Sequence, residues 1–353
     1  DLNAYILAGL QSDHECTSRV EAEEKLKNGM YIFIREGSAE QNIEALTPLV
    51  TPVTVSRCCF ATDDCHASLL MEDGHIDRCI RKAIGCGLSP ELAIRMATLS
   101  PAERFGLTDR GALSPGRRAD LCLVDDPEKF VVRDVFHKGK KFSVSSPSHR
   151  VTFPPSIHCS PPGPGALRIT GRGMARVIGI VPGQIVTESL RYDCNADEIP
   201  DLDRDIFKVV VCNRYHDIPC GIGLVHGFRF KDGAIACSIS HDAHNIVAAG
   251  TSDDIILRAI AEVIKVQGGL VAIHRHECAV LPLDCAGLMS THPFEDVVCK
   301  LRDLHEVTVM MCGIENPFMY LSFLALTVIP SLRITDRGVF NSDTFQDVPL
   351  FIE

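Results

Sequence analysis

The sequence is poor in basic residues. Its 353 residues include 35 Lys and Arg against 46 Asp and Glu, which gives a net charge of −11 at neutral pH. Because a phosphate backbone repels a chain with this balance, we expect no nucleic acid among its partners. The hydrophobic fraction of 46% and the charged fraction of 23% exclude a disordered or fibrous protein and favour domains with a sizeable core.

The sequence also lacks an apolar run long enough to span a bilayer. Its most apolar segment, residues 317–330, is shorter than the roughly 18 to 20 residues that a span needs and has a proline at each end, so we predict a buried helix and no membrane association. No signal-peptide pattern is present, and the 16 cysteines have no regular spacing. We therefore expect a cytoplasmic protein with free thiols and not a disulfide scaffold.

Several well-known catalytic signatures are absent. The sequence has no G-x-S-x-G elbow, Walker loop, H-E-x-x-H or C-x-x-C motif. Gly221, Gly223 and Gly227 do not have the spacing of a dinucleotide-binding fingerprint. The sequence therefore gives no reason to expect a nucleotide cofactor.

The pattern of the chain predicts an α/β protein with several parts. Residues 1–107 alternate short apolar runs with capped helical stretches, which is typical of β/α units around a parallel sheet. Residues 108–145 are rich in strand and turn signals and predict a small β domain, while residues 146–165, rich in proline and serine, predict a linker. Residues 166–353 predict a further α+β domain.

Ionisable residues gather where three strands of the first part are expected to end. The strands are predicted at residues 9–11, 30–35 and 53–61, and the clusters that follow are Asp13-His14-Glu15, Arg35-Glu36 and Asp63-Asp64. In a parallel β/α sheet these strand ends lie at one edge, which is where active sites form. Turn and cap preferences explain Asp13 and Asp64 equally well, but not a histidine and further carboxylates at successive strand ends.

His14 and Asp63 are our candidates for metal ligands within these clusters. A histidine and a carboxylate at neighbouring strand ends can hold a divalent cation that makes bound water acidic, while the carboxylate accepts the proton. Two ligands are too few, since catalytic centres usually have three or more from the protein. The metal hypothesis therefore requires further ligands upstream of Asp1; otherwise His14 is a histidine with a local hydrogen bond.

A second polar cluster occupies residues 240–245, with the sequence SHDAHN. Two histidines, a carboxylate and an amide in one short loop fit a substrate site or a second metal site. A polar turn whose His and Asn side chains bond the backbone fits equally well.

The chain resembles the adenine deaminases of the amidohydrolase superfamily. The matching stretches run from Asp1 to the C-terminus and include DLNAYILAGLQSDHECTS, GMYIFIREGSAEQNIEAL, FATDDCHASLL, SHDAHN and PFMYLSFLAL, the last two being peculiar to this family. The resemblance implies a (β/α)₈ TIM barrel of which only the last strands are present, part of a small β-sandwich domain, and an added C-terminal α+β domain.

The same resemblance implies metal-dependent hydrolysis of adenine to hypoxanthine and ammonia, with Mn²⁺ or Fe²⁺ more than Zn²⁺ as the metal. By superfamily pattern, His14 and Asp63 are metal ligands after the sixth and eighth strands, and Asp63 relays a proton as water attacks C6 of the purine. Glu36 after the seventh strand is expected to contact or protonate a ring nitrogen. The remaining expected purine contacts are Glu15, His241, Asp242 and His244.

The resemblance also implies that some ligands are missing. The H-x-H of the first strand, the bridging acidic ligand and the histidine after the fifth strand have no counterpart from Asp1 onward. We therefore expect poor solubility, association with a missing N-terminal portion, or a homo-oligomer. Two alternatives stay open, a non-catalytic purine-binding remnant and another amidohydrolase acting on a cyclic amide or a different aminopurine.

Overall fold

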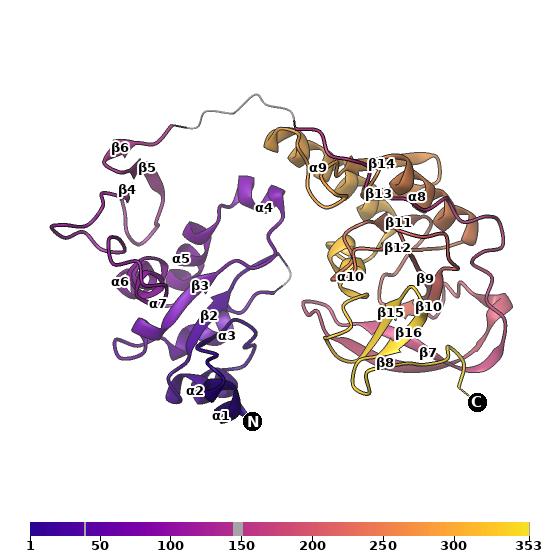
Figure 1. Cartoon of the computed structure of the whole chain (residues 1–353), viewed down its shortest axis with the longest axis horizontal. Helices are drawn as coiled ribbons and strands as arrows, with labels where there is room; N and C mark the ends of the chain where they lie inside the picture. The colour runs from indigo at the N-terminus through magenta and orange to yellow at the C-terminus, as the bar shows by residue number, and fades with distance from the viewer. Residues whose placement is uncertain (39, 144–150, 353) are drawn as a thin grey trace. The chain divides into compact units, whose positions relative to one another are not determined.

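The computed structural model describes residues 1–38, 40–143 and 151–352, which form two compact units (Figure 1). The first unit is Asp1–Ser148 and the second is His149–Glu353. The finer boundaries predicted at residues 107, 145 and 165 stay predictions, and residues 146–150 of the predicted linker lie outside the described residues.

A three-stranded parallel sheet forms the centre of the first unit. Its strands are β1 (Ser12–Asp13), β2 (Tyr31–Arg35) and β3 (Cys58–Ala61), paired in that order. Parallel neighbours need crossover connections, which here include α2 (Arg19–Lys27), α3 (Ile43–Leu46), η1 (Thr47–Leu49) and η2 (Val55–Arg57). The parallel β/α pattern expected from the sequence is therefore present.

Burial of apolar side chains explains the packing of this sheet against its helices. Ile32 and Ile34 of β2 are buried against Cys58 and the helices that follow. These helices are α4 (Ala67–Glu72), α5 (Ile76–Gly85), α6 (Pro90–Ala97) and α7 (Leu99–Arg104). Ser18 caps α2 by accepting a hydrogen bond from the Glu21 N–H at 3.4 Å.

Some predicted boundaries in the first unit are wrong. Helix α1 (Leu2–Leu7) precedes β1, which begins at Ser12 and not at residue 9. Strand β3 begins at Cys58, because the preceding residues of the predicted strand turn into η2. A small antiparallel sheet follows, formed by β4 (Leu121–Val124), β5 (Val132–His137) and β6 (Lys140–Lys141).

An eight-stranded sheet forms the second unit, in the order β14-β13-β11-β12-β9-β10-β7-β8. The β7–β10 pair is parallel and every other pair in this sheet is antiparallel. The strands are β7 (Arg172–Ile180), β8 (Thr187–Asn195), β9 (Ile206–Cys212), β10 (Gly221–His226), β11 (Ala234–Cys237), β12 (Ile246–Gly250), β13 (Gly269–His274) and β14 (Glu277–Pro282).

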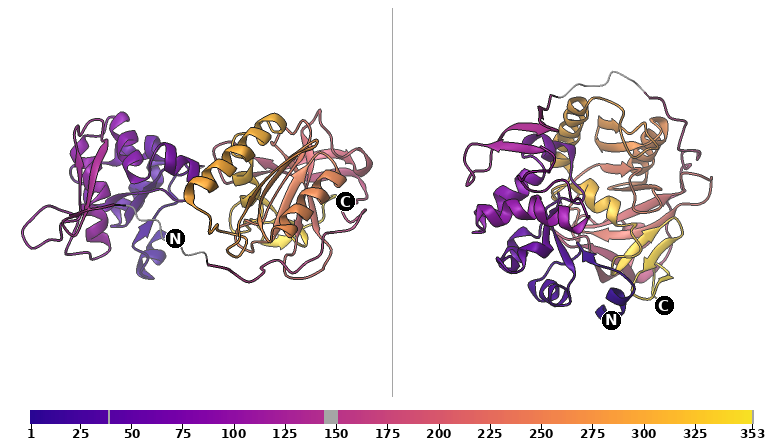
Figure 2. Two further views of the ribbon diagram at one scale, coloured as in Figure 1. Left: turned by 90° about the horizontal axis from the view of Figure 1, so that it is seen from above. Right: turned by 60° about the vertical axis from the view of Figure 1, so that its left-hand side comes forward.

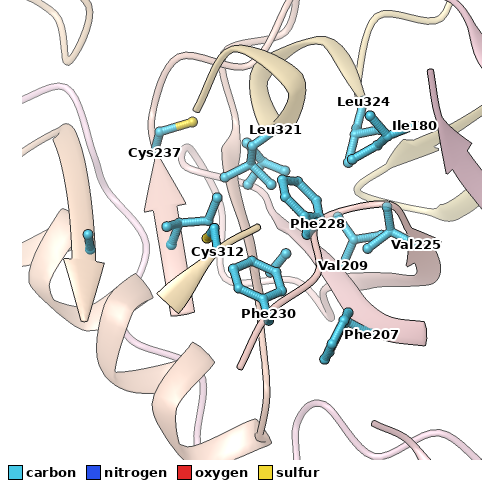
Figure 3. Close-up of a cluster of buried hydrophobic side chains, with 14 of the residues drawn as sticks. Ile180, Phe207, Val209, Val225, Phe228, Phe230, Cys237, Cys312, Leu321 and Leu324 are labelled. Atoms are coloured by element: carbon cyan, nitrogen blue, oxygen red, sulfur yellow. The ribbon is translucent and has the colours of Figure 1, made fainter. Parts of the chain in front are cut away.

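Helices cover both faces of this sheet (Figure 2). Helix α8 (Asp253–Lys265) packs on one face, while α9 (Phe294–Met311) and α10 (Pro317–Phe323) contribute to the core of the other. Figure 3 shows part of that core, where Phe228 and Phe230 lie among aliphatic side chains. A hairpin of β15 (Leu332–Thr335) and β16 (Gly338–Asn341), extended by β17 (Gln346–Asp347), completes the unit.

Residues 151–165, assigned by the sequence to a linker, lie against the second unit. Ile157 is buried, and the Ser156 N–H donates to Oε1 of Gln267 at 3.2 Å. The His158 N–H donates to the Arg214 carbonyl at 2.7 Å. Among the helices of the described ranges, no segment is at once long and apolar enough to pass through a bilayer.

Candidate active site

The carboxyl ends of β1, β2 and β3 bring together a histidine and two carboxylates. His14 Nε2 lies 3.2 Å from Oε1 of Glu15 and 3.9 Å from Oδ2 of Asp63. His14 and Glu15 directly follow β1, and Asp63 follows β3 by two residues. Because the strands are parallel, the loops after their carboxyl ends lie at the same edge of the sheet. Residues far apart in sequence therefore become neighbours.

Arg35, the last residue of β2, lies between these two carboxylates. Its Nη1 is 2.9 Å from Oδ2 of Asp63 and 3.0 Å from Oε2 of Glu15, and the Arg35 side chain is only 3% exposed. A buried guanidinium that bonds two carboxylates holds both in a defined orientation. Sequence reasoning places Arg35 at the strand end but assigns it no role, since the pattern does not show which way its side chain points.

The loops after β2 and β3 are joined by backbone contacts that position Asp63. The Ser38 N–H donates to the Asp64 carbonyl at 2.9 Å, and Ser38 Oγ accepts from the His66 N–H at 2.9 Å. A Cβ on Gly37 would lie 2.6 Å from the Thr62 carbonyl oxygen, so only glycine allows this close approach.

Glu36 points into the protein and away from solvent. The residue is fully buried, its Oε1 pairs with Lys82, and its Oε2 accepts from the Ile43 N–H at 3.2 Å. Arg78 Nη1 lies 3.7 Å from the same carboxylate. The Glu36 carboxylate is thus bound by residues of its own unit and is shielded from solvent. This position does not fit the predicted contact with a purine ring nitrogen.

Glu40 is a buried acidic residue near this site to which sequence reasoning gives no role. It is 6% exposed, and neither carboxylate oxygen bonds another residue of the described ranges. Burial raises the pKa of Glu40 to about 7, and the nearby Asp63 carboxylate acts in the same direction while Arg35 opposes it. The only sequence signal was a carboxylate in the loop that follows a strand end, and that signal does not show burial.

The donor set of this edge fits a divalent cation. One atom each of His14, Glu15 and Asp63 lie within 4.8 Å of one another, and all three residues are exposed enough for an ion to reach them. One nitrogen and two carboxylate oxygens suit Mn²⁺, Fe²⁺ or Zn²⁺. Glu15, expected from the sequence to contact substrate, offers the third donor atom of this group.

A second acidic group in the same unit does not fit a cation. Asp13, Cys16 and Glu21 also come close together, but the ammonium of Lys25 lies among them, 2.5 Å from Oε1 of Glu21 and paired with Asp13. Lys25 already supplies the positive charge that a metal would bring.

The loop at residues 240–245 lies in the second unit, between β11 and β12. The His241 ring packs 4.6 Å from the Phe323 ring and 6.0 Å from the His244 ring, measured between centroids. Arg214 holds the loop through Nη1, which donates to the His244 carbonyl at 3.2 Å, and through its N–H, which donates to Oδ1 of Asn245 at 3.2 Å.

Two polar atoms of this loop are left available. His244 Nδ1 and Ser240 Oγ are buried without a hydrogen bond to any part of the chain that the structure covers. Burial lowers the pKa of His244, and the neighbouring His241 and Arg214 act in the same direction, which favours a neutral imidazole. Asp242 is exposed. The loop thus offers a neutral imidazole and a hydroxyl as hydrogen-bonding groups.

Comparison with known families gives two matches that together cover most of the chain. Residues 3–142 match the amidohydrolase family, and residues 184–346 match the adenine deaminase C-terminal domain. The resemblance stated from the sequence motifs is confirmed by these matches.

Curated relatives agree with the family matches. The chain is 60% identical to an adenine deaminase of Methanoregula boonei over 99% of its own length and 63% of that protein. It is 57% identical to an adenine deaminase of Methanoculleus marisnigri, covering 100% of the chain and 68% of that protein, and 40% identical to one of Brucella anthropi, covering 98% and 63%. The chain thus spans a little under two thirds of the length of the Methanoregula protein.

Proposed function

This chain belongs to the adenine deaminase family of the amidohydrolases, and we propose that it takes part in the hydrolytic deamination of adenine to hypoxanthine and ammonia. The observation that carries the proposal is the meeting of His14, Glu15 and Asp63 at the carboxyl ends of β1 and β3, the two strands that flank β2 in the parallel sheet. Relatives of high identity that bear the name adenine deaminase support the choice of substrate.

We further propose that β1, β2 and β3 belong to a (β/α)₈ barrel, in which they would be the sixth, seventh and eighth strands. Their parallel pairing and the amidohydrolase match support this assignment. The sheet of β4 to β6 would then belong to the small β-sandwich domain, and the second unit would be the added C-terminal domain.

His14 and Asp63 would hold a divalent cation, with Glu15 as the third donor and Mn²⁺ or Fe²⁺ as the preferred ion. When bound, such a cation supplies the Lewis acidity that makes water nucleophilic near neutral pH. Asp63 accepts the proton of the attacking water and passes it to the departing amine. Arg35, at 2.9 Å, keeps the Asp63 carboxylate in its orientation during these transfers.

Glu40 takes the role that the sequence assigned to Glu36. A carboxyl with a pKa of about 7 is partly protonated at neutral pH and can donate a hydrogen bond to a purine ring nitrogen. Its buried oxygens, which bond no other residue of the part of the chain that the structure describes, gain a partner when a heterocycle is present. The purine contacts predicted at His241, Asp242 and His244 lie in the second unit and stay predictions; neutral His244 can donate or accept a hydrogen bond there.

The second candidate function is purine binding without catalysis. It is favoured by Arg35, whose guanidinium already neutralises Asp63 and Glu15 and so competes with a cation for the same oxygens. The two functions differ in whether bound adenine is converted to hypoxanthine.

The test measures adenine loss by ultraviolet absorbance on the protein as its gene encodes it, stripped with EDTA and reloaded with Mn²⁺, Fe²⁺ or Zn²⁺. Asp63→Asn and His14→Ala should each lower turnover by about 10²-fold or more, while the exposed controls Asp343→Asn and His276→Ala should not. Mn²⁺ affinity measured by calorimetry should fall in the same two site variants. Unchanged turnover and unchanged affinity in Asp63→Asn would refute the proposed site, and binding of adenine without its loss would favour the second candidate.

A further inference from the structure

A cavity of about 220 Å³ in the second unit is lined by three cysteines. Cys159, Cys212 and Cys220 share it with His216 and Asp217. Cys212 is buried, whereas Cys159 and Cys220 are partly exposed, so small solutes reach the thiols from solvent. No step of the proposed deamination uses this cluster.

Strand register places two of these thiols opposite each other. In the antiparallel β9–β10 pair, Gly221 faces Val211 and Ile222 faces Val210. Continuing this register by one position sets Cys220 against Cys212. Side chains at directly opposite positions of an antiparallel pair have Cβ atoms about 4.5 to 5.5 Å apart, close to the separation across a disulfide.

The backbone on both sides of the pair is held in place. The Asn213 Nδ2 donates to Oδ2 of Asp336 at 2.7 Å, and a Cβ on Gly221 would lie 2.0 Å from the Thr335 carbonyl oxygen, so both strand ends pack on the β15–β16 turn. The Arg214 N–H is bonded to Asn245. The two cysteines are therefore kept near each other before any bond forms.

The two thiols are not equivalent. Cys212 is buried, whereas Cys220 is partly exposed, and the interaction between the two thiols raises the pKa of Cys212 and lowers the pKa of Cys220. Cys220 is thus the member of the pair that more readily becomes a thiolate, and the thiolate is the nucleophile in thiol oxidation. Cys212 is the thiol held next to it.

We propose that Cys212 and Cys220 are a peroxide-reactive dithiol that closes to a disulfide. The Cys220 thiolate attacks one oxygen of hydrogen peroxide, the O–O bond breaks, and the products are a sulfenic acid and hydroxide, which takes up a proton to become water. The Cys212 sulfur then attacks Sγ of Cys220, the S–O bond breaks, and the leaving hydroxide combines with the Cys212 proton. Two thiols give up two electrons, and one peroxide becomes two waters.

A metal is a weaker explanation of the same cluster. Among the described residues, the groups of donor atoms that all lie within 4.8 Å of one another do not include these three cysteines. A disulfide needs only the opposed pair.

Peptide mapping tests the proposal, because Arg214 separates the two cysteines. Trypsin places Cys212 in residues 209–214, Cys220 in residues 215–229 and Cys159 in residues 151–168. The reduced protein is treated with hydrogen peroxide, alkylated and digested. The expected product is peptide 209–214 linked to peptide 215–229, lighter than the two reduced peptides together by two hydrogens.

Variants identify the order of events. Cys212→Ser should leave a sulfenic acid on Cys220 that dimedone traps, Cys220→Ser should abolish the linked peptide, and Cys159→Ser should retain it. Cys220 should react about tenfold faster than Cys278, an exposed residue whose thiol is partly shielded from water, which raises its pKa. A link from Cys159 to Cys220 in place of the predicted one, or oxidation of Cys278 while Cys212 and Cys220 stay reduced, would overturn the proposal. Both of these results can be read from the unmodified protein, so they do not depend on the folding of a variant.

Discussion

The unfolding free energy of the protein should fall as the pH rises, because Glu40 becomes ionised, and it should fall less in Glu40→Gln. The pKa of Glu40 is about 7 in the folded protein against 4.5 for an ordinary glutamate, chiefly because the carboxyl is buried. A difference of this size corresponds to about 3 kcal/mol, at roughly 1.4 kcal/mol for each pH unit.

The sign follows from which state binds the proton more tightly. The folded protein favours the neutral carboxyl, so its stabilising effect is complete below pH 4.5 and is lost as the pH rises through about 7. Between pH 5 and 8.5 the first unit should therefore lose about 3 kcal/mol of unfolding free energy through Glu40 alone. Glu40→Gln, which is neutral at every pH, should keep this stability.

The assay is urea denaturation at pH 5 and 8.5, with EDTA present so that no cation binds beside Asp63. Pulse-labelled hydrogen exchange in peptides covering β2 and β3 reports the first unit separately from the second, which is necessary because two units need not unfold together. Glu44→Gln, at an exposed position of α3, is the matched control and should follow the unmodified protein. The reasoning is refuted if the stability of the unmodified protein and of Glu40→Gln changes in parallel between the two pH values.

Three further predictions concern packing and titration. Gly37→Ala should destabilise the first unit by about 1 to 3 kcal/mol, since the added Cβ would lie 2.6 and 2.7 Å from two backbone oxygens. The control Gly85→Ala adds a Cβ in open space and should not lower the thermal midpoint. Arg333→Met should lower the unfolding free energy by about 3 to 5 kcal/mol in denaturant titrations, because the fully buried guanidinium donates to four backbone carbonyls that would lose their partner. Arg337→Met, at an exposed position, is the control. His244 should titrate below the ordinary 6.5 when its ring is followed by NMR, and a midpoint at or above that value would contradict its burial.

The strand-end location of the candidate site follows from local patterns. Apolar runs bounded by caps indicate where strands end, and parallel strands end at one edge, which is why His14, Glu15 and Asp63 could be named as neighbours before any geometry was known. Helix ends were less predictable. The buried helix predicted for residues 317–330 spans only Pro317–Phe323 (α10), while α9 continues to Met311 because Val307 and Met311 are buried against the sheet.

The sequence by itself determined the family, the β/α order of the first unit and the residues at its strand ends, because periodicity, capping and motif spacing are local properties of the chain. Only the tertiary structure decided which side chains are buried and where they point. Glu36 and Glu40 are both acidic residues of one loop, yet packing pairs the first with Lys82 and gives the carboxylate of the second no hydrogen bond to another residue of the described ranges. The pairing of Cys212 with Cys220 likewise depends on the register of two strands, and register is set by how apolar faces meet across the whole sheet.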